Sequence, residues 1–177
     1  MVRGLDLFRE RFRPFQGMIT LIGGAACDEW FTTNGMNFRA TDDLDLVIMM
    51  DDYFGLIQAH HDERDGLWVA NATSLIPLKA LAWLNLTKAK AAGEAVDSRN
   101  IKKHCADVFR LAATLPGVAG PDLPQSIKDE LVSFLQEFPP DSADWPAILA
   151  SLRNTIPGTF RPADLREAIQ IYFGIVR

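Results

Sequence analysis

Two pairs of residues near the start of the chain have the types and spacing to bind a metal ion and a phosphate group. The first pair is Asp43 and Asp45 in "DDLDLVI", which are two positions apart. On a strand, this spacing places both carboxylates on the same face. Neighbouring carboxylates repel each other unless a cation lies between them, and Mg²⁺ or Mn²⁺ prefers such oxygen ligands. The alternative for this motif is a solvated strand end without a metal.

The second pair is Gly23 and Gly24, which separate the apolar run "MITLI" from the helix-like stretch "AACDEWFTT". A Gly-Gly turn between a strand and a helix lets backbone amides approach a phosphate at the positive end of the helix dipole. The alternative is a turn without a ligand. Phosphates at the glycines and a metal ion at the carboxylates would together make a site for nucleotidyl transfer.

Charge is distributed unevenly along the chain. Acids predominate from Asp42 to Asp65, whereas bases predominate from Lys79 to Arg110. This pattern suggests a metal ion near the first stretch and a phosphate near the second, although two solvated faces of opposite sign explain it equally well. The net charge of −5 argues against a generally basic nucleic-acid-binding protein.

Several classes of protein are disfavoured by the composition. No apolar run approaches the roughly 20 residues needed to span a bilayer, and the N-terminal stretch lacks a signal-peptide core. Cys27 and Cys105 lie far apart and belong to no CxxC motif. We therefore expect a cytoplasmic protein without membrane contact, containing two buried free thiols.

The sequence predicts an α+β fold with a small mixed β-sheet and a helical C-terminal half. Residues 1–75 form an α/β core in which strand, Gly-Gly turn, helix and strand follow one another, with Asp43 and Asp45 on the central strand. Residues 76–177 form the helical half, which we expect to pack on the core as one continuous domain. Its helices are predicted at 77–92, 99–115, 125–138, 145–154 and 162–173, the first beginning at Pro77 with Gly93 beyond its end, and the second capped by Ser98.

The order of these motifs resembles the nucleotidyltransferase superfamily with the DNA-polymerase-β-like fold. In that superfamily a GG or GS turn opens a helix, and an Asp-x-Asp motif follows on the next long strand. The chain is more closely similar to bacterial nucleotidyltransferases of the AbiEii toxin type. The similar segments, in the same order, are "GGAACDEWF", "FRATDDLDLVI", "LIPLKALAWLNL" and "DSRNIKKHCADVFRLA".

The resemblance implies a role for each matching residue. Lys79, in the first turn of its predicted helix, would contact the triphosphate, and Asp107 would pack against it. An exposed helical lysine, and a simple pair between Lys103 and Asp107, are the alternatives. The implied catalytic residues are Asp43, Asp45, Lys79 and Asp107. The implied nucleotide-binding residues are Gly23, Gly24, Arg39, Thr41 and Lys79, with Asp43 and Asp45 binding Mg²⁺ or Mn²⁺.

The implied activity is Mg²⁺-dependent transfer of a nucleotide from an NTP to a hydroxyl of RNA, such as tRNA, or of a protein. The resemblance further implies a toxin with a cognate antitoxin. However, superfamily members carry a third carboxylate on a later strand. Here the later strand-like run, "GLWVA", carries no acid, and Asp62, Glu63 and Asp65 are expected in a loop. Because general-base assistance contributes roughly 10²–10⁴-fold, a degenerate, non-catalytic module that binds a nucleotide or a partner is the alternative.

Overall fold

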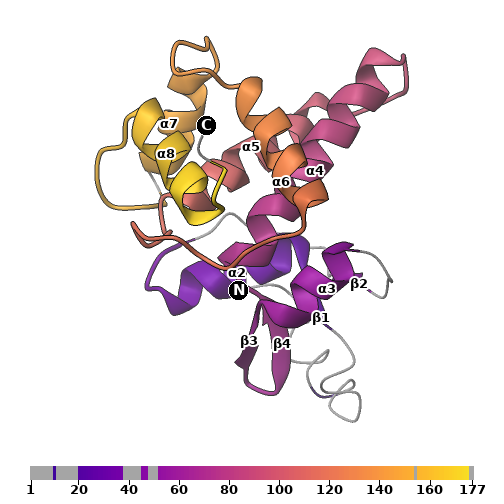
Figure 1. Cartoon of the computed structure of the whole chain (residues 1–177), viewed down its shortest axis with the longest axis vertical. Coiled ribbons are helices and arrows are strands. Elements are labelled where there is room, and N and C mark those ends of the chain that lie inside the picture. Colours follow the sequence, from indigo (N-terminus) through magenta and orange to yellow (C-terminus); the bar gives the residue numbers. More distant parts are fainter. Residues whose placement is uncertain (1–9, 11–19, 38–44, 48–51, 154, 176–177) are drawn as a thin grey trace. The chain divides into compact units, whose positions relative to one another are not determined.

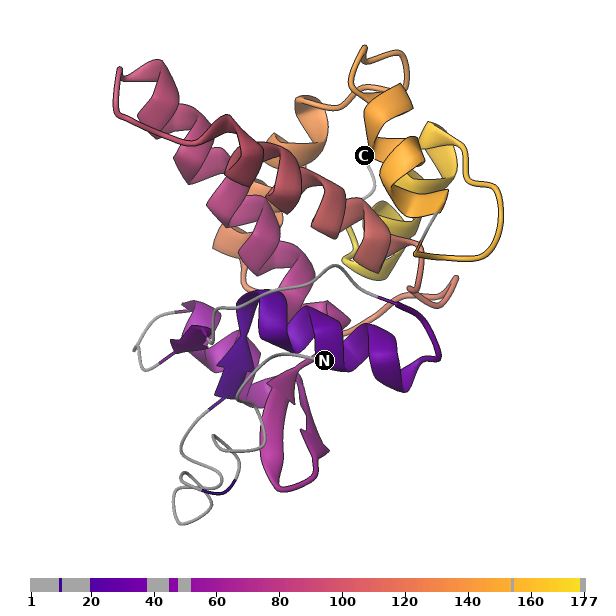
Figure 2. The same cartoon turned by 180° about the vertical axis from the view of Figure 1, so that it is seen from behind.

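In a computed structural model of the chain, residues 10, 20–37, 45–47, 52–153 and 155–175 are described. Their contacts divide the chain into two units, Met1–Leu75 and Ile76–Arg177. A small sheet with short helices lies in the first unit, and the second unit is helical (Figures 1 and 2). The predicted α+β class is therefore confirmed, whereas the packing of both parts as one continuous domain stays a prediction.

The sheet of the first unit is mixed, as predicted. Its four described strands have the order β2-β1-β4-β3, with β1 antiparallel to β2 and parallel to β4. The strands are β1 (Thr20–Ile22), β2 (Asp45–Val47), β3 (His61–Arg64) and β4 (Leu67–Ala70). Among these four strands Asp45 thus lies on an outer one, whereas the predicted central position concerns the sheet as a whole and, for Asp43, falls outside the described residues. The inner position beside β1 is taken by β4, which returns parallel to it.

The β3–β4 hairpin was missed by the sequence analysis. Asp65 and Gly66 join its strands, and both have positive φ angles, of 48° and 78°. An Asp-Gly pair is a preferred sequence for a two-residue hairpin turn with this backbone twist. Asp62 and Glu63 therefore lie on a strand rather than in the expected loop, because the turn pairs a polar edge strand with the buried β4.

Two helices of the first unit lie within the described residues. Helix α2 (Gly23–Thr33) follows β1 directly, and its Ala25, Ala26 and Phe31 side chains are fully buried. It ends at Asn34, as predicted, where the backbone and side-chain amides donate to the carbonyl of Trp30. Helix α3 (Asp52–Ala59) leads into the hairpin.

Helix α4 (Ala72–Ala91) begins five residues before the predicted start at Pro77. Asn71 precedes it, and the Asn71 side-chain oxygen accepts a hydrogen bond from the Thr73 amide at 3.1 Å. Pro77 therefore lies inside the helix. The apolar residues before Pro77 are all buried, so no polar face marked them as helical in the sequence. Lys79 consequently does not lie in the first turn.

The second unit is built from the rest of α4 and four further helices. These are α5 (Ser98–Ala112), α6 (Gln125–Gln136), α7 (Trp145–Arg153) and α8 (Pro162–Tyr172). The cap of α5 is Asp97 rather than the predicted Ser98, since the Asp97 carboxylate accepts the Arg99 amide at 2.9 Å. Within the described ranges, every helix is too short or too polar to cross a lipid bilayer.

The core of the second unit is aromatic. The Phe109 ring lies 4.7 Å from the Trp145 ring and 5.7 Å from the Phe134 ring, measured between centroids. Trp83 and Phe138 extend this cluster, at 5.1 Å from each other. Aromatic pairs at such distances stabilise a core beyond the area they bury. Cys27 and Cys105 are free and buried, as predicted.

Candidate functional site

The glycine turn between β1 and α2 is built by backbone conformation. Gly23 has a φ of 69°, a left-handed conformation that costs other residues roughly 1–2 kcal/mol. Ile22, at the cap position, is extended and makes no side-chain hydrogen bond to the helix, and the first turn contains no acid. The N-cap side chain therefore leaves the amides that begin α2 uncapped. Such amides, together with the helix dipole, favour an anion.

The outer strand β2 places Asp45 beside this turn. In the antiparallel pairing of β1 and β2, Asp45 is the partner of Ile22, the residue that precedes Gly23. Directly paired residues have Cα atoms about 4.5–5.5 Å apart. The backbone of one predicted metal ligand thus lies next to the predicted phosphate-binding turn. Arg39, Thr41 and Asp43 lie outside the described residues, so their predicted roles stay predictions.

The acids of the β3–β4 hairpin lie too far from Asp45 to share a metal ion with it. Strands β2 and β3 are at opposite ends of the strand order. At about 4.8 Å per strand, three spacings separate them by about 14 Å. Asp62 instead accepts a hydrogen bond from Arg64 at 2.8 Å and one from Asn71 at 3.5 Å. It therefore stabilises the hairpin and the start of α4.

A metal site is not formed by the described residues alone. Among them, no group of three or more His, Cys, Asp or Glu side chains is arranged to hold a metal ion. The predicted ligand Asp43 lies outside these residues, so binding of Mg²⁺ or Mn²⁺ stays a prediction.

A buried charge cluster in the second unit joins Lys79, Asp107 and Arg110. The Lys79 ammonium lies 3.4 Å from one oxygen of Asp107, and Arg110 donates to the other oxygen at 2.9 Å. The side chains of Lys79 and Asp107 are 5% and 0% exposed. The alternative of an exposed lysine at position 79 was therefore wrong. The contact that the resemblance implied between Lys79 and Asp107 is present, while their roles in catalysis remain predictions.

Arg110 is a member of this cluster that the sequence analysis did not single out. Besides Asp107, its guanidinium contacts the carbonyl oxygen of Ser151, with two nitrogens at 3.3 Å. The sequence could have indicated this pair, because Arg110 follows Asp107 by three residues and such a spacing places both side chains on one helix face. No sequence pattern could have predicted the contact with α7, because Ser151 is distant from Arg110 in the sequence.

The cluster holds two cations around one carboxylate. Among the described residues, Asp107 is the only acid in ion-pair contact with either Lys79 or Arg110. Burial of charge is unfavourable unless an opposite charge compensates it. An excess of buried positive charge therefore favours a nearby anion, such as a phosphate.

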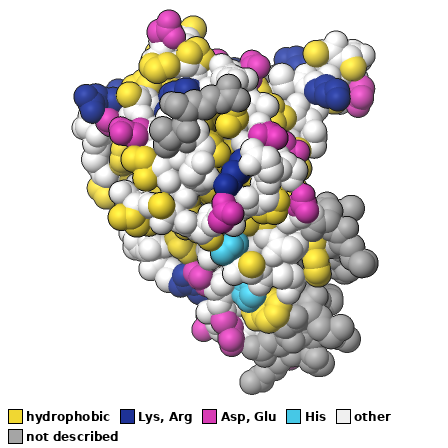
Figure 3. Space-filling view, viewed as in Figure 1, with side chains coloured by type: hydrophobic (Ala, Val, Ile, Leu, Met, Phe, Trp, Pro, Cys, Tyr) yellow, Lys and Arg dark blue, Asp and Glu magenta, His cyan; other side chains and the backbone are white. Residues whose placement is uncertain are grey.

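Other basic residues of the second unit have local structural roles. Lys88 and Lys90 lie in the last turn of α4, where cations complement the helix dipole, and Lys90 donates to Ser98 at 2.8 Å. Arg99 pairs with the cap residue Asp97 at 2.9 Å. In the view of Figure 3, Lys and Arg side chains are scattered among acids rather than gathered in one patch. The solvated-surface interpretation thus describes these bases well.

Comparison with known proteins identified no relative of the chain. No protein-family model matches the chain, and neither a curated protein nor a solved structure matches it. The nucleotidyltransferase resemblance therefore rests on the sequence segments quoted above.

Proposed function

We propose that this chain is a nucleotidyltransferase-like protein that binds an NTP at the turn formed by Gly23 and Gly24. The observation that carries the proposal is the strand register. Asp45 is paired with Ile22, directly beside the uncapped start of α2. A metal-binding carboxylate and a phosphate-binding turn must be neighbours for nucleotidyl transfer, and this register favours that arrangement.

In this proposal the glycine amides bind phosphate oxygens, and Asp43 and Asp45 hold Mg²⁺ or Mn²⁺. A contact between Lys79 and the triphosphate is a part of the proposal that rests on the resemblance; within the second unit, Lys79 and Arg110 both pair with Asp107. In the transfer step, an acceptor hydroxyl oxygen bonds to the α-phosphorus and the bond to the leaving pyrophosphate breaks. An acceptor on RNA, including tRNA, or on a protein, and action as a toxin with an antitoxin, are parts of the proposal that rest on the resemblance.

The second candidate is a non-catalytic module that binds a nucleotide or a partner. It is favoured by the position of β3, whose acids lie at the opposite end of the strand order from Asp45. Without a third carboxylate near the metal, the hydroxyl proton lacks an evident acceptor, and such assistance is worth roughly 10²–10⁴-fold in rate. Binding with little transfer is the expected behaviour of this candidate.

Calorimetric titration with each NTP and Mg²⁺ tests the binding site shared by both candidates. Lys79→Met removes the charge while keeping most of the side-chain volume, which matters because Lys79 is buried. We expect it to weaken NTP binding by about 10–150-fold, the value of one charge-assisted phosphate contact. Lys128→Met, which removes a lysine paired with Asp122 elsewhere on the unit, is the matched control. Equal NTP affinity in Lys79→Met and wild type would end the assignment of Lys79.

A transfer assay separates the two candidates. The protein is incubated with each labelled NTP, Mg²⁺ and total RNA, and the RNA and protein fractions are examined for label. Label that disappears in Asp45→Asn indicates the enzyme. Nucleotide binding without label indicates the binding module, and the absence of both overturns the proposal.

A further inference from the structure

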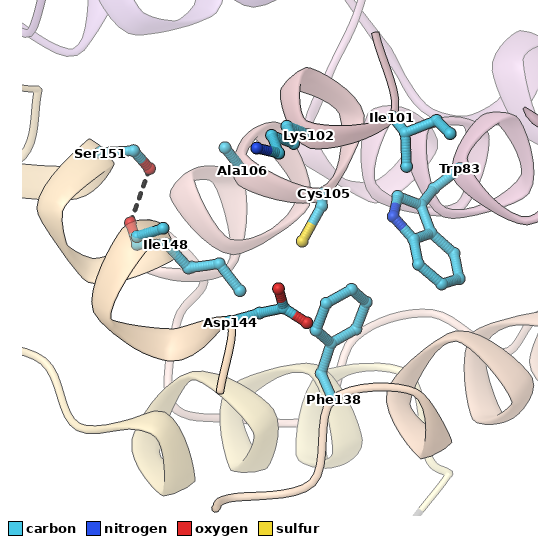
Figure 4. Close-up of a pocket in the computed structure, with 10 residues that line it drawn as sticks. Trp83, Ile101, Lys102, Cys105, Ala106, Phe138, Asp144, Ile148 and Ser151 are labelled. Atoms are coloured by element: carbon cyan, nitrogen blue, oxygen red, sulfur yellow. Dashed lines mark hydrogen bonds between the residues drawn. The ribbon is translucent and has the colours of Figure 1, made fainter. Parts of the chain in front are cut away.

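The second unit contains a hollow that the nucleotide proposal does not use. It has a volume of about 330 Å³ and lies between the C-terminal half of α4, the first turns of α5 and the start of α7 (Figure 4). Most of its wall is apolar, formed by Trp83, Ile101, Ala106, Phe138, Ala147 and Ile148. This volume is at the lower end of the roughly 300–1,000 Å³ typical of ligand pockets, which suits a single ring with a short chain.

Two side chains of opposite charge also line this hollow. Lys102 comes from α5, and Asp144 immediately precedes α7. Neither forms an ion pair with another residue in the described part of the chain. The Asp144 carboxylate has a distant contact with the Ser142 hydroxyl, at 3.4 Å, and points toward Cys105 and Phe138 (Figure 4). A cation and an anion are thus available at one apolar pocket.

The remaining polar groups of the wall are already neutral or occupied. The Ser151 hydroxyl donates to the Ile148 carbonyl at 2.6 Å. Burial and the nearby negative charges of Asp144 and Asp107 raise the pKa of the Cys105 thiol, so that it stays protonated. Cys105 therefore acts as part of the apolar wall rather than as a nucleophile. Lys102 and Asp144 are therefore the lining residues that could recognise a charged ligand.

We propose that this hollow binds a free α-amino acid with an aromatic side chain. Its ammonium group pairs with Asp144, its carboxylate pairs with Lys102, and its ring packs against Trp83, Phe138 and Ile148. Lys102 and Asp144 are both solvent-exposed, so water satisfies their charges and the apolar wall supplies most of the affinity. A zwitterion adds an ion pair with each of them, whereas an amine or an acid alone adds one. This proposal does not rest on the proposed nucleotide site.

Calorimetric titration of the full chain with L-phenylalanine tests this proposal. Phenethylamine lacks the carboxylate, 3-phenylpropionate lacks the ammonium group, and glycine lacks the ring. We expect L-phenylalanine to bind about 2–5-fold more tightly than phenethylamine or 3-phenylpropionate, each of which loses one solvent-exposed ion pair. It should bind more than about 10-fold more tightly than glycine, which loses the contacts of the ring. Failure of L-phenylalanine to bind at millimolar concentration would overturn the proposal. If phenethylamine or 3-phenylpropionate binds as tightly as L-phenylalanine, the ligand does not need both charged groups, and the proposed pairing with both Asp144 and Lys102 is wrong.

Substitutions of the lining residues test which side chains contact the ligand. Asp144→Asn and Lys102→Gln are each expected to weaken L-phenylalanine binding by about 2–5-fold, the value of one solvent-exposed ion pair. Their matched controls, Asp141→Asn and Lys88→Gln, change exposed residues that do not line the hollow and should leave binding unchanged. Ala147→Phe, also at an exposed position, should block binding by filling the hollow. Circular dichroism verifies that each variant is folded. Unchanged affinity in folded Asp144→Asn, or in folded Ala147→Phe, would show that the hollow is not the site.

Discussion

The two units differ in the features that would suit the proposed phosphate ligand. In the first unit, the features that suit a phosphate belong to the backbone: a glycine with positive φ, the uncapped amides of α2 and the pairing of Asp45 with Ile22. In the second unit, they belong to largely buried side chains of α4 and α5, in which Lys79 and Arg110 surround Asp107, and Arg110 also reaches the backbone carbonyl of Ser151 in α7. Backbone features of this kind leave a signature in a short stretch of sequence, whereas a buried charge cluster does not.

The two candidate sites should also differ in how strongly a substitution lowers the free energy of unfolding. A glycine turn contributes mainly by permitting a conformation, so its replacement introduces a limited strain. A buried carboxylate between two cations compensates their desolvation, so its loss leaves charges uncompensated in the interior. The second unit should therefore be the more sensitive of the two to a single substitution at its candidate site.

The largest effect is expected for Asp107→Asn. This change leaves Lys79 and Arg110 buried without their carboxylate, and breaking a buried pair in this way costs about 3–5 kcal/mol. The free energy of unfolding, measured by urea titration with circular dichroism, checks it. Asp97→Asn is the control, since Asp97 is exposed and asparagine caps a helix about as well as aspartate. A loss for Asp107→Asn no larger than that of the control would contradict the comparison between the units.

A smaller effect is expected for Gly23→Ala in the first unit. Alanine at a φ of 69° is strained by about 1–2 kcal/mol, which should lower the free energy of unfolding by that amount. Gly55→Ala is a matched change inside α3, where an added methyl group meets no atom within 4 Å. That variant should gain about 0.5–1 kcal/mol, because alanine favours a helix over glycine. Stabilisation by both changes would show that the turn needs no glycine.

A still smaller loss of stability is expected when the cap of α4 is removed. Asn71→Ala removes the oxygen that accepts the Thr73 amide, and loss of such a cap typically costs about 1 kcal/mol. Thermal melting of Asn71→Ala, compared with Asn71→Ser, measures it, because serine retains a capping oxygen. If both variants melt at the same temperature, the helix does not depend on this cap.

The smallest effect concerns pH and His60. Burial, followed by the neighbouring His61, lowers the pKa of His60 below 6.5. As pH falls below 6.5, the unfolded chain binds a proton that the folded chain does not, so stability decreases with acidification. We expect the melting temperature to fall between pH 7.5 and pH 5.5, and to fall less in His60→Gln. An equal fall in both proteins would exclude His60 as the cause.

Particular elements show how far the sequence could predict the fold. The Gly-Gly turn, α2 and its end at Asn34 follow from local rules on glycine, helical spacing and helix termination, and the structure contains them. The start of α4 was misplaced because its first residues are buried all round and give no amphipathic pattern. The β3 strand was missed because its polar residues, "HDER", become a strand by pairing with β4.

The sequence by itself determined the α+β class, the position of the glycine turn and the spacing of the two aspartates, because each depends on neighbours in the chain. The tertiary structure alone decided that Lys79 is buried, that Arg110 joins Asp107, and that the acids of β3 lie far from Asp45. It also decided that Lys102 and Asp144 line one hollow. Those relations join residues far apart in sequence, and their energies depend on burial, which no local pattern specifies.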